Sequence, residues 1–252
     1  MAVTLKDVVL GEGRVKVIVP ITGRTEEELV AQASELARHA LDLVEWRVDF
    51  FERAHDVDAV LAAAARVADA LGGRPVLFTF RTAAEGGERS IDPDAYAALN
   101  LALVDAGLVD AVDVELAFDG AAGDAVLRGA HARGVAVVGS AHEFQATPSA
   151  DEIVGRLVAM QRRGFDVAKM AVMPADAGDV LTLLQATWTM ATRHPETPVI
   201  TMAMAGRGLV TRLAGQVFGS CATFATVGRP SAPGQVPVEQ LQPILALVDA
   251  NL

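Results

Sequence analysis

The sequence predicts a single α/β domain, a (β/α)8 barrel that spans residues 1–252. Apolar runs alternate with helical patterns about eight times along the chain, which is typical of a parallel sheet covered by helices. The length of 252 residues suits one barrel of this kind, and no linker or change of composition separates a second domain. A doubly wound open sheet is the alternative. The turn after the first strand, PITGRTEEE, lacks the G-x-G-x-x-G pattern that this alternative requires.

Eight short runs rich in apolar and β-branched residues are the expected barrel strands. Runs of this kind are typical of parallel strands that are buried on both faces. They occupy residues 15–20, 43–49, 75–81, 110–116, 134–142, 167–174, 198–204 and 222–227.

Helical patterns lie between these strands, and several carry start and stop signals. The first pattern opens at Thr25 as an N-cap, and Glu28 three residues later predicts a capping box. The expected helices occupy residues 25–40, 56–73, 92–107, 149–164, 176–194, 210–219 and 238–250. The stretch GRPSAPGQVP at 228–237 is rich in Gly and Pro and follows the eighth strand. It is therefore expected to be a loop that acts as a lid.

The composition argues against several classes of function. A net charge of −11 and a pI near 4.9 disfavour binding to nucleic acid or to an anionic membrane surface. The uncharged run 180–192 is too short and too polar to span a bilayer, and charges near the start leave no secretory signal. Cys221 is the only cysteine, which excludes an intrachain disulfide and favours a reducing, cytoplasmic location.

Charged residues interrupt the predicted strands in a pattern that places them inside the barrel. On the second strand Glu45, Arg47 and Asp49 share one face, and on the fourth strand Asp113 and Glu115 do the same. Because the alternating apolar residues should pack on the helices, the charged face should point into the barrel. Three more strands carry one such residue each: Arg81, His142 and Lys169. Buried ion pairs seldom stabilise a fold better than apolar packing, so this convergence predicts a functional site.

The position of Lys169 in the sixth strand indicates imine chemistry. Burial, together with a neighbouring Arg47 or Arg81, would favour the neutral amine, which attacks ketones and aldehydes. His142 on the adjacent strand would carry protons near neutral pH. No zinc motif surrounds this histidine, so no metal site is predicted. A class I aldolase and a noncatalytic barrel that binds a small acid are left open by the residues alone.

Six motifs extend over nearly the whole chain in one order. They are EWRVD (45–49), FTFRTAAEGGE (78–88), SAHEF (140–144), AKMAVMP (168–174), ITMAMAGRGLVTRLAGQVFGS (200–220) and SAPGQ (231–235). Together they resemble those of the type I 3-dehydroquinate dehydratases, the imine-forming dehydratases of the shikimate pathway. The resemblance implies a (β/α)8 barrel, often a homodimer, that needs no metal or organic cofactor. It also implies the conversion of 3-dehydroquinate to 3-dehydroshikimate and water.

The resemblance assigns roles residue by residue. It implies that Lys169 forms the Schiff base, that His142 is the general acid and base, and that Glu85 orients this histidine. Arg212 would bind the substrate carboxylate. The other implied substrate contacts are at strand ends, on the pocket wall and in the lid: Glu45, Arg47, Arg81, Met202, Met204, Phe224, Ser231 and Gln235. Beside His142, Ala141 and Glu143 depart from the Tyr and the Asp or Asn common in the family.

Overall fold

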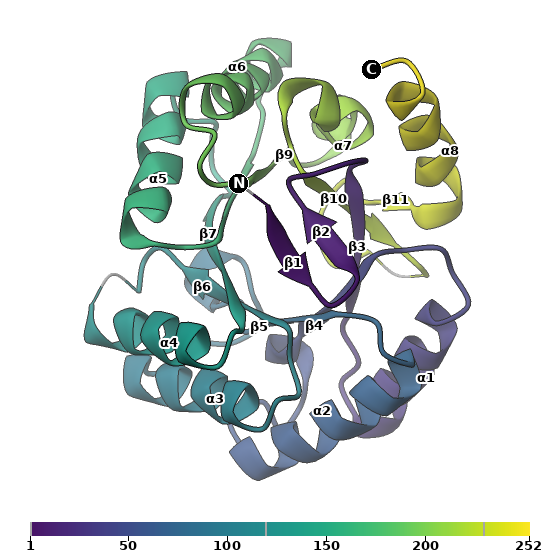
Figure 1. The fold of residues 1–252 in the computed structure, drawn as a ribbon, viewed down its shortest axis with the longest axis vertical. Coiled ribbons are helices and arrows are strands. Elements are labelled where there is room, and N and C mark those ends of the chain that lie inside the picture. The colour runs from purple at the N-terminus through teal and green to yellow at the C-terminus, as the bar shows by residue number, and fades with distance from the viewer. Residues whose placement is uncertain (1, 119, 229) are drawn as a thin grey trace.

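In the computed structural model, which describes residues 2–118, 120–228 and 230–252, a curled parallel sheet is enclosed by helices (Figure 1). The strand order is β11-β10-β3-β4-β5-β6-β7-β8-β9. Eight of these strands form the wall of the barrel: β3 (Lys16–Ile21), β4 (Leu43–Arg47), β5 (Val76–Thr79), β6 (Ala111–Glu115), β7 (Ala136–Glu143), β8 (Val167–Val172), β9 (Val199–Ala203) and β10 (Ala222–Thr226). The short β11 (Val236–Pro237) extends the edge of the sheet beside β10.

The wall closes between β9 and β10. The Cys221 amide donates to the Val199 carbonyl at 2.8 Å, and the Thr201 amide donates to the Ser220 hydroxyl at 3.2 Å. An isolated parallel bridge joins Val199 to Ser220, so the two ends of the sheet meet without a continuous ladder. The predicted (β/α)8 barrel is therefore confirmed.

Helices follow the strands around the outside of the wall (Figure 1). They are α1 (Glu26–Leu36), α2 (Val57–Leu71), α3 (Pro93–Asp105), α4 (Ala121–Ala132), α5 (Ala150–Arg163), α6 (Ala177–Arg193), α7 (Leu209–Ala214) and α8 (Val238–Asp249). Thr25 caps α1 as predicted by accepting from the Glu28 amide, whereas the Glu28 carboxylate accepts from the Arg24 amide, one residue before the cap. The sequence assigned no range to α4. Its N-cap is Gly120, which offers no side chain to accept a hydrogen bond.

An antiparallel hairpin of β1 (Val3–Leu5) and β2 (Val8–Leu10) lies across the N-terminal end of the barrel (Figure 1). Its buried residues Leu5, Val8 and Leu10 pack on the apolar residues inside the barrel. This hairpin was not predicted from the sequence, because each of its strands is only three residues long. It closes the end of the barrel that is opposite to the site.

Two apolar cores confirm the alternation that was read along the strands. Val44 and Trp46 of β4 belong to the outer core, between the wall and the helices, whereas Leu43 belongs to the inner core. Glu45, which lies between Val44 and Trp46 in the sequence, is buried and faces the interior of the barrel. Among the described residues, no helix is long and apolar enough to cross a membrane.

Candidate active site

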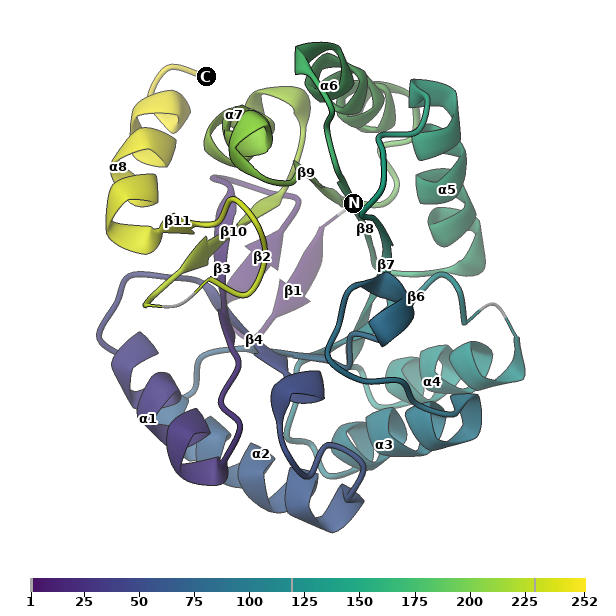
Figure 2. The same ribbon diagram turned by 180° about the vertical axis from the view of Figure 1, so that it is seen from behind.

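A cavity opens at the C-terminal ends of the strands, and all twelve candidate residues line it. They are Glu45, Arg47, Arg81, Glu85, His142, Lys169, Met202, Met204, Arg212, Phe224, Ser231 and Gln235. The segment between β10 and β11 passes over this end of the barrel (Figure 2). This is the end where the side chains of barrel enzymes meet their substrates.

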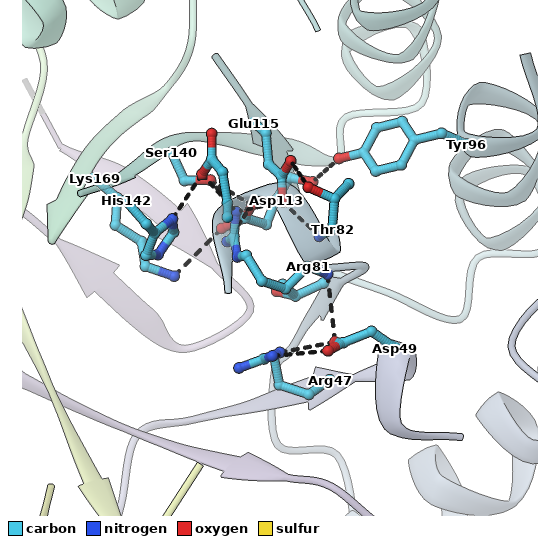
Figure 3. Close-up of polar contacts among 12 residues, drawn as sticks. Arg47, Asp49, Arg81, Thr82, Tyr96, Asp113, Glu115, Ser140, His142 and Lys169 are labelled. Atoms are coloured by element: carbon cyan, nitrogen blue, oxygen red, sulfur yellow. Dashed lines mark hydrogen bonds and ion pairs between the residues drawn. The ribbon is translucent and has the colours of Figure 1, made fainter. Parts of the chain in front are cut away.

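Arg81, just after β5, connects several of the inward carboxylates (Figure 3). Its guanidinium donates to Asp113 at 2.7 Å, to Glu115 at 2.9 Å and to Glu85 at 3.4 Å. It also donates to the Ser140 hydroxyl at 2.9 Å. With 3% of its surface exposed, Arg81 is held by the protein in one position, and its charge offsets those of the surrounding carboxylates.

Lys169 is buried on β8 between two carboxylates. Its Nζ lies 3.4 Å from Oε1 of Glu45 and 3.3 Å from Oδ2 of Asp113. The same nitrogen lies 4.6 Å from the centre of the Phe224 ring, in a cation–π contact. The sequence predicted Arg47 or Arg81 as a neighbour of this lysine. The structure also gives it two anionic partners, Glu45 and Asp113, which were not expected.

His142, near the end of β7, pairs with Glu85 from the 3-10 turn Ala83–Glu85 that follows β5. Nδ1 of the imidazole lies 2.8 Å from Oε2 of the carboxyl group. Burial, and then the positive charges of Arg81 and Lys169, hold the pKa of His142 well below its usual value. Burial also raises the pKa of Glu85 to about 8, against the opposing effect of Arg81. The pair is therefore placed to hold and release protons near neutral pH.

The turn that carries Glu85 depends on a glycine. Gly86 has φ +80°, and a Cβ at this position would lie 2.3 Å from the ring of Phe144. Phe144 in turn stacks on His142, with ring centroids 6.4 Å apart. The absence of a side chain at Gly86 therefore lets this turn approach the histidine closely.

Arg47 ends β4 and is fixed by Asp49 (Figure 3). The guanidinium donates twice to the Asp49 carboxylate, at 2.8 Å from both Nε and Nη2. The predicted strand 43–49 is two residues too long, because residues 48–50 form a 3-10 turn. Asp49 consequently lies outside the cavity, where it supports Arg47 and accepts from the Arg81 amide at 3.3 Å.

Arg212 is buried on α7 and has no carboxylate partner among the described residues. Its Nη2 donates to the Pro233 carbonyl at 3.1 Å, and its Nη1 contacts the sulfur of Met202 at 3.7 Å. Its Nε has no hydrogen-bond partner in the described part of the chain. Burial lowers the pKa of Arg212 to about 10. A buried cation with an unused donor is suited to binding an anion.

The expected lid segment, 228–237, docks over the cavity, although its residue 229 lies outside the described residues. The Pro233 carbonyl also accepts from the Ala205 amide at 3.2 Å. Within the segment, the Gln235 side chain accepts from the Ser231 amide at 2.8 Å and donates to the Ser231 hydroxyl at 3.1 Å. Both candidate lid residues, Ser231 and Gln235, line the same cavity as Arg212.

Several residues that support the site were not predicted from the sequence. Phe144 and Gly86 line the cavity, and Ser140 donates to Asp113 at 2.6 Å. Ser140, His142 and Phe144 are each two residues apart, so the same alternation along β7 would have identified them. Asp113 was recognised as facing inward but was given no role in the site.

The chemistry available here is that of one amine, one imidazole and several fixed charges. The cavity contains a lysine, which can act as a nucleophile, and a histidine–carboxyl pair, which can carry protons. It also contains three arginines, which can bind anionic or hydroxyl groups. Within the described residues, no group of three or more His, Cys, Asp or Glu is arranged to hold a metal ion.

Comparison with known proteins identifies close relatives. The family model described as type I 3-dehydroquinase matches residues 17–251. The 3-dehydroquinate dehydratase of Bacillus licheniformis is 45% identical over 250 residues, which cover 99% of this chain and 98% of the relative. That of Salmonella agona is 45% identical over 246 residues, which cover 98% of each protein.

Solved structures of the same family are also similar to this chain. One is a type I 3-dehydroquinate dehydratase from Clostridium difficile with covalently modified comenic acid, which has a TM-score of 0.97 and 41% sequence identity. The match covers 100% of this chain and 99% of the Clostridium difficile chain. The 3-dehydroquinate dehydratase of Geobacillus kaustophilus has a TM-score of 0.96 and 37% identity, with coverage of 99% and 97%.

Proposed function

Since the chain belongs to the type I 3-dehydroquinase family and has its activity, the dehydration of 3-dehydroquinate, we propose that the reaction proceeds through an imine on Lys169 with His142 as general acid and base. The observation that carries this proposal is the convergence of the two side chains on one cavity, each with its own carboxyl partner.

Lys169 begins the reaction. Its Nζ must become neutral before it attacks the C3 ketone, and Glu45 and His142 are proton acceptors that line the same cavity. Loss of water from the adduct leaves a C=N bond between C3 and Nζ. The protonated imine then draws electrons from the adjacent C2–H bond and so makes this proton removable.

His142 carries the proton in the second half of the reaction. With its Nδ1 directed to Glu85, the imidazole takes the C2 proton through its other nitrogen. The electron pair moves through the enamine to expel the C1 hydroxyl, and His142 returns the proton to this leaving group. Hydrolysis of the product imine by water releases 3-dehydroshikimate and regenerates Lys169.

The remaining residues bind and orient the substrate. Arg212 is the proposed partner of its carboxylate, because the guanidinium is buried, faces the cavity and keeps an unused donor. The polar groups Glu45, Arg47 and Arg81 are the proposed contacts of the hydroxyl groups and the imine region. Met202, Met204 and Phe224 form the wall. Ser231 and Gln235 are proposed to close over the ligand and to exclude water.

The proposal extends to a homodimer that works in the cytoplasm. Leu181 and Trp188 of α6 are 67% and 47% exposed and form an apolar groove with Val217, which is 47% exposed. Residues 180–192 carry no charge, which allows two acidic molecules to approach along this helix without repulsion. Sedimentation of Trp188→Glu beside the wild type tests this surface, and an unchanged mass would contradict it.

The direct test of the function is a dehydration assay. Purified protein treated with a chelator should convert 3-dehydroquinate to a conjugated product that absorbs in the ultraviolet, with stoichiometric loss of substrate. Lys169→Ala and His142→Ala serve as matched variants, because both leave Arg212 and the lid intact. Full activity in either variant would contradict the roles proposed for these two residues.

A further inference from the structure

Asp113 contacts Lys169 without lining the cavity (Figure 3). It lies on β6 with no exposed surface, and its Oδ2 is 3.3 Å from Nζ of Lys169. Glu45, the other carboxylate on this lysine, lines the cavity and lies 3.4 Å from the same nitrogen. A substrate that enters the cavity can therefore engage Glu45, whereas Asp113 keeps Lys169 as its partner.

Asp113 is held in place by a closed ring of hydrogen bonds. Its Oδ1 accepts from Arg81 at 2.7 Å and from Ser140 at 2.6 Å, and Ser140 accepts from Arg81 at 2.9 Å. Burial acts to raise the pKa of Asp113, but the charges of Arg81 and Lys169 outweigh it and lower this pKa below the usual value. The carboxylate is thus a fixed negative charge that points at the reacting nitrogen.

We propose that Asp113 is a further catalytic residue, whose carboxylate keeps the imine nitrogen on Lys169 protonated during the reaction. The inference rests on the proposed imine mechanism. When the adduct loses its hydroxyl, the C–O bond breaks and the C=N bond forms. The hydroxyl leaves as water with the proton that Lys169 first gave up to Glu45 or His142, and one hydrogen stays on the nitrogen. A fixed carboxylate within hydrogen-bonding reach favours this cationic form, which is the form that accepts electrons from the C2–H bond.

The contact between Asp113 and the nitrogen of Lys169 acts again in the later steps of the reaction. Removal of the C2 proton by His142 places the electron pair on the neutral enamine nitrogen. Expulsion of the C1 hydroxyl, with a proton from His142, restores the positive charge on nitrogen beside Asp113. The protonated product imine is also the form that water attacks most readily.

The test compares two substitutions that each remove one negative charge from Arg81. Asp113→Asn removes the carboxylate that also touches Lys169, whereas Glu115→Gln removes a carboxylate bonded to Arg81 and Thr82. The pH dependence of kcat is measured for both variants and for the wild type. The proposal predicts that the wild-type rate falls at alkaline pH, when the imine nitrogen loses its proton.

We expect Asp113→Asn to move this alkaline limb to lower pH by about 1 to 3 units, the usual effect of losing an opposite charge at this distance. Glu115→Gln should leave the limb at the pH of the wild type, even if its rate is lower. Equal shifts in the two variants would overturn the proposal, because the effect would then belong to Arg81. An unshifted limb in Asp113→Asn would overturn it as well.

A measurement on the wild type covers the case in which Asp113→Asn fails to fold. The chemical shift of a 13C-labelled imine carbon, observed with bound 3-dehydroshikimate, reports whether the imine is protonated. The proposal expects the protonated imine throughout the neutral range, and titration to the neutral imine there would contradict it. If no imine forms at all, the proposed function fails, and this outcome is distinct from a failure of Asp113 alone.

Discussion

The carboxyl group of Glu85 lies 2.8 Å from Nδ1 of His142, which leaves Nε2 as the imidazole nitrogen available to a substrate. Glu85 also receives a hydrogen bond from Arg81, at 3.4 Å. Through Arg81, the histidine pair and the Lys169–Asp113 pair belong to one buried network. The proposed proton carrier and the proposed nucleophile are therefore both linked to the same guanidinium.

His142→Ala should still form the imine, because Glu45 remains as a proton acceptor for Lys169, but it should fail at transfer of the C2 proton. Turnover should fall by about 10²- to 10⁴-fold, the usual range for a lost general acid or base. Borohydride trapping in this variant, compared with the wild type, measures imine formation separately from turnover. A folded variant without adduct would show that His142 is also needed to form the imine.

Glu85→Gln should change how stability depends on pH. Because the pKa of Glu85 is raised to about 8 in the folded protein, the folded state holds a proton that the unfolded state releases, so stability falls as pH rises toward 8. The lowered pKa of His142 has the opposite effect, but only below about pH 6.5, its ordinary value. Between about pH 6.5 and about pH 8, the wild type should therefore lose stability more steeply than Glu85→Gln.

Thermal unfolding of both proteins across this pH range measures the difference. Glu85→Gln keeps the size of the side chain, so packing is matched. If the stability of the two proteins changes with pH in parallel, Glu85 is ionised in the folded state at neutral pH.

Arg212→Ala should weaken binding of 3-dehydroshikimate by about 10- to 100-fold, because a hydrogen bond to a charged group contributes roughly 1.5 to 3 kcal/mol. Gln235→Ala should weaken it less, by about 2- to 10-fold, as expected for one neutral hydrogen bond. Since the pKa of Arg212 is about 10, wild-type affinity should also decline as the pH approaches that value. Calorimetry measures all three proteins, and unchanged affinity in Arg212→Ala would place the substrate carboxylate elsewhere.

The segment 228–237 should become more protected from hydrogen exchange when product is bound. Its Pro233 carbonyl already accepts from Arg212 and Ala205, and Gly234 has φ +80° beside the Ala205 carbonyl, where a Cβ would lie at 2.5 Å. Gly234→Ala should prevent this docking and raise KM. Mass spectrometry of exchange in the wild type, with and without product, tests the idea. Equal protection in both states would mean a preformed loop.

The sequence predicted the barrel well because its signals are local. Apolar runs place the strands, and the alternation of Glu45 with its apolar neighbours gives the inward face. The hairpin of β1 and β2 escaped prediction because three-residue strands show little periodicity, and α4 because Gly120 provides no side-chain cap. Both depend on packing against the completed barrel.

The contacts within the site were less accessible to sequence reasoning. Local patterns place Lys169 in a strand, but they do not show that Glu45 and Asp113 lie on either side of its nitrogen. These partners come from strands β4 and β6, which are distant from β8 along the chain. The sequence predicted Arg47 or Arg81 near Lys169 but not these anionic contacts, and in the structure Arg81 and Lys169 share the carboxylate of Asp113.

The central claim is that Lys169 forms an imine with the substrate, and borohydride trapping tests it most directly. The wild type is treated with 3-dehydroquinate and borohydride, digested and analysed by mass spectrometry, with Lys169→Ala as the matched control. We predict a reduced, stable adduct on the peptide that contains Lys169, loss of activity in the trapped protein, and no adduct or activity in the variant. An adduct on another residue, or substantial dehydratase activity in Lys169→Ala, would contradict the account.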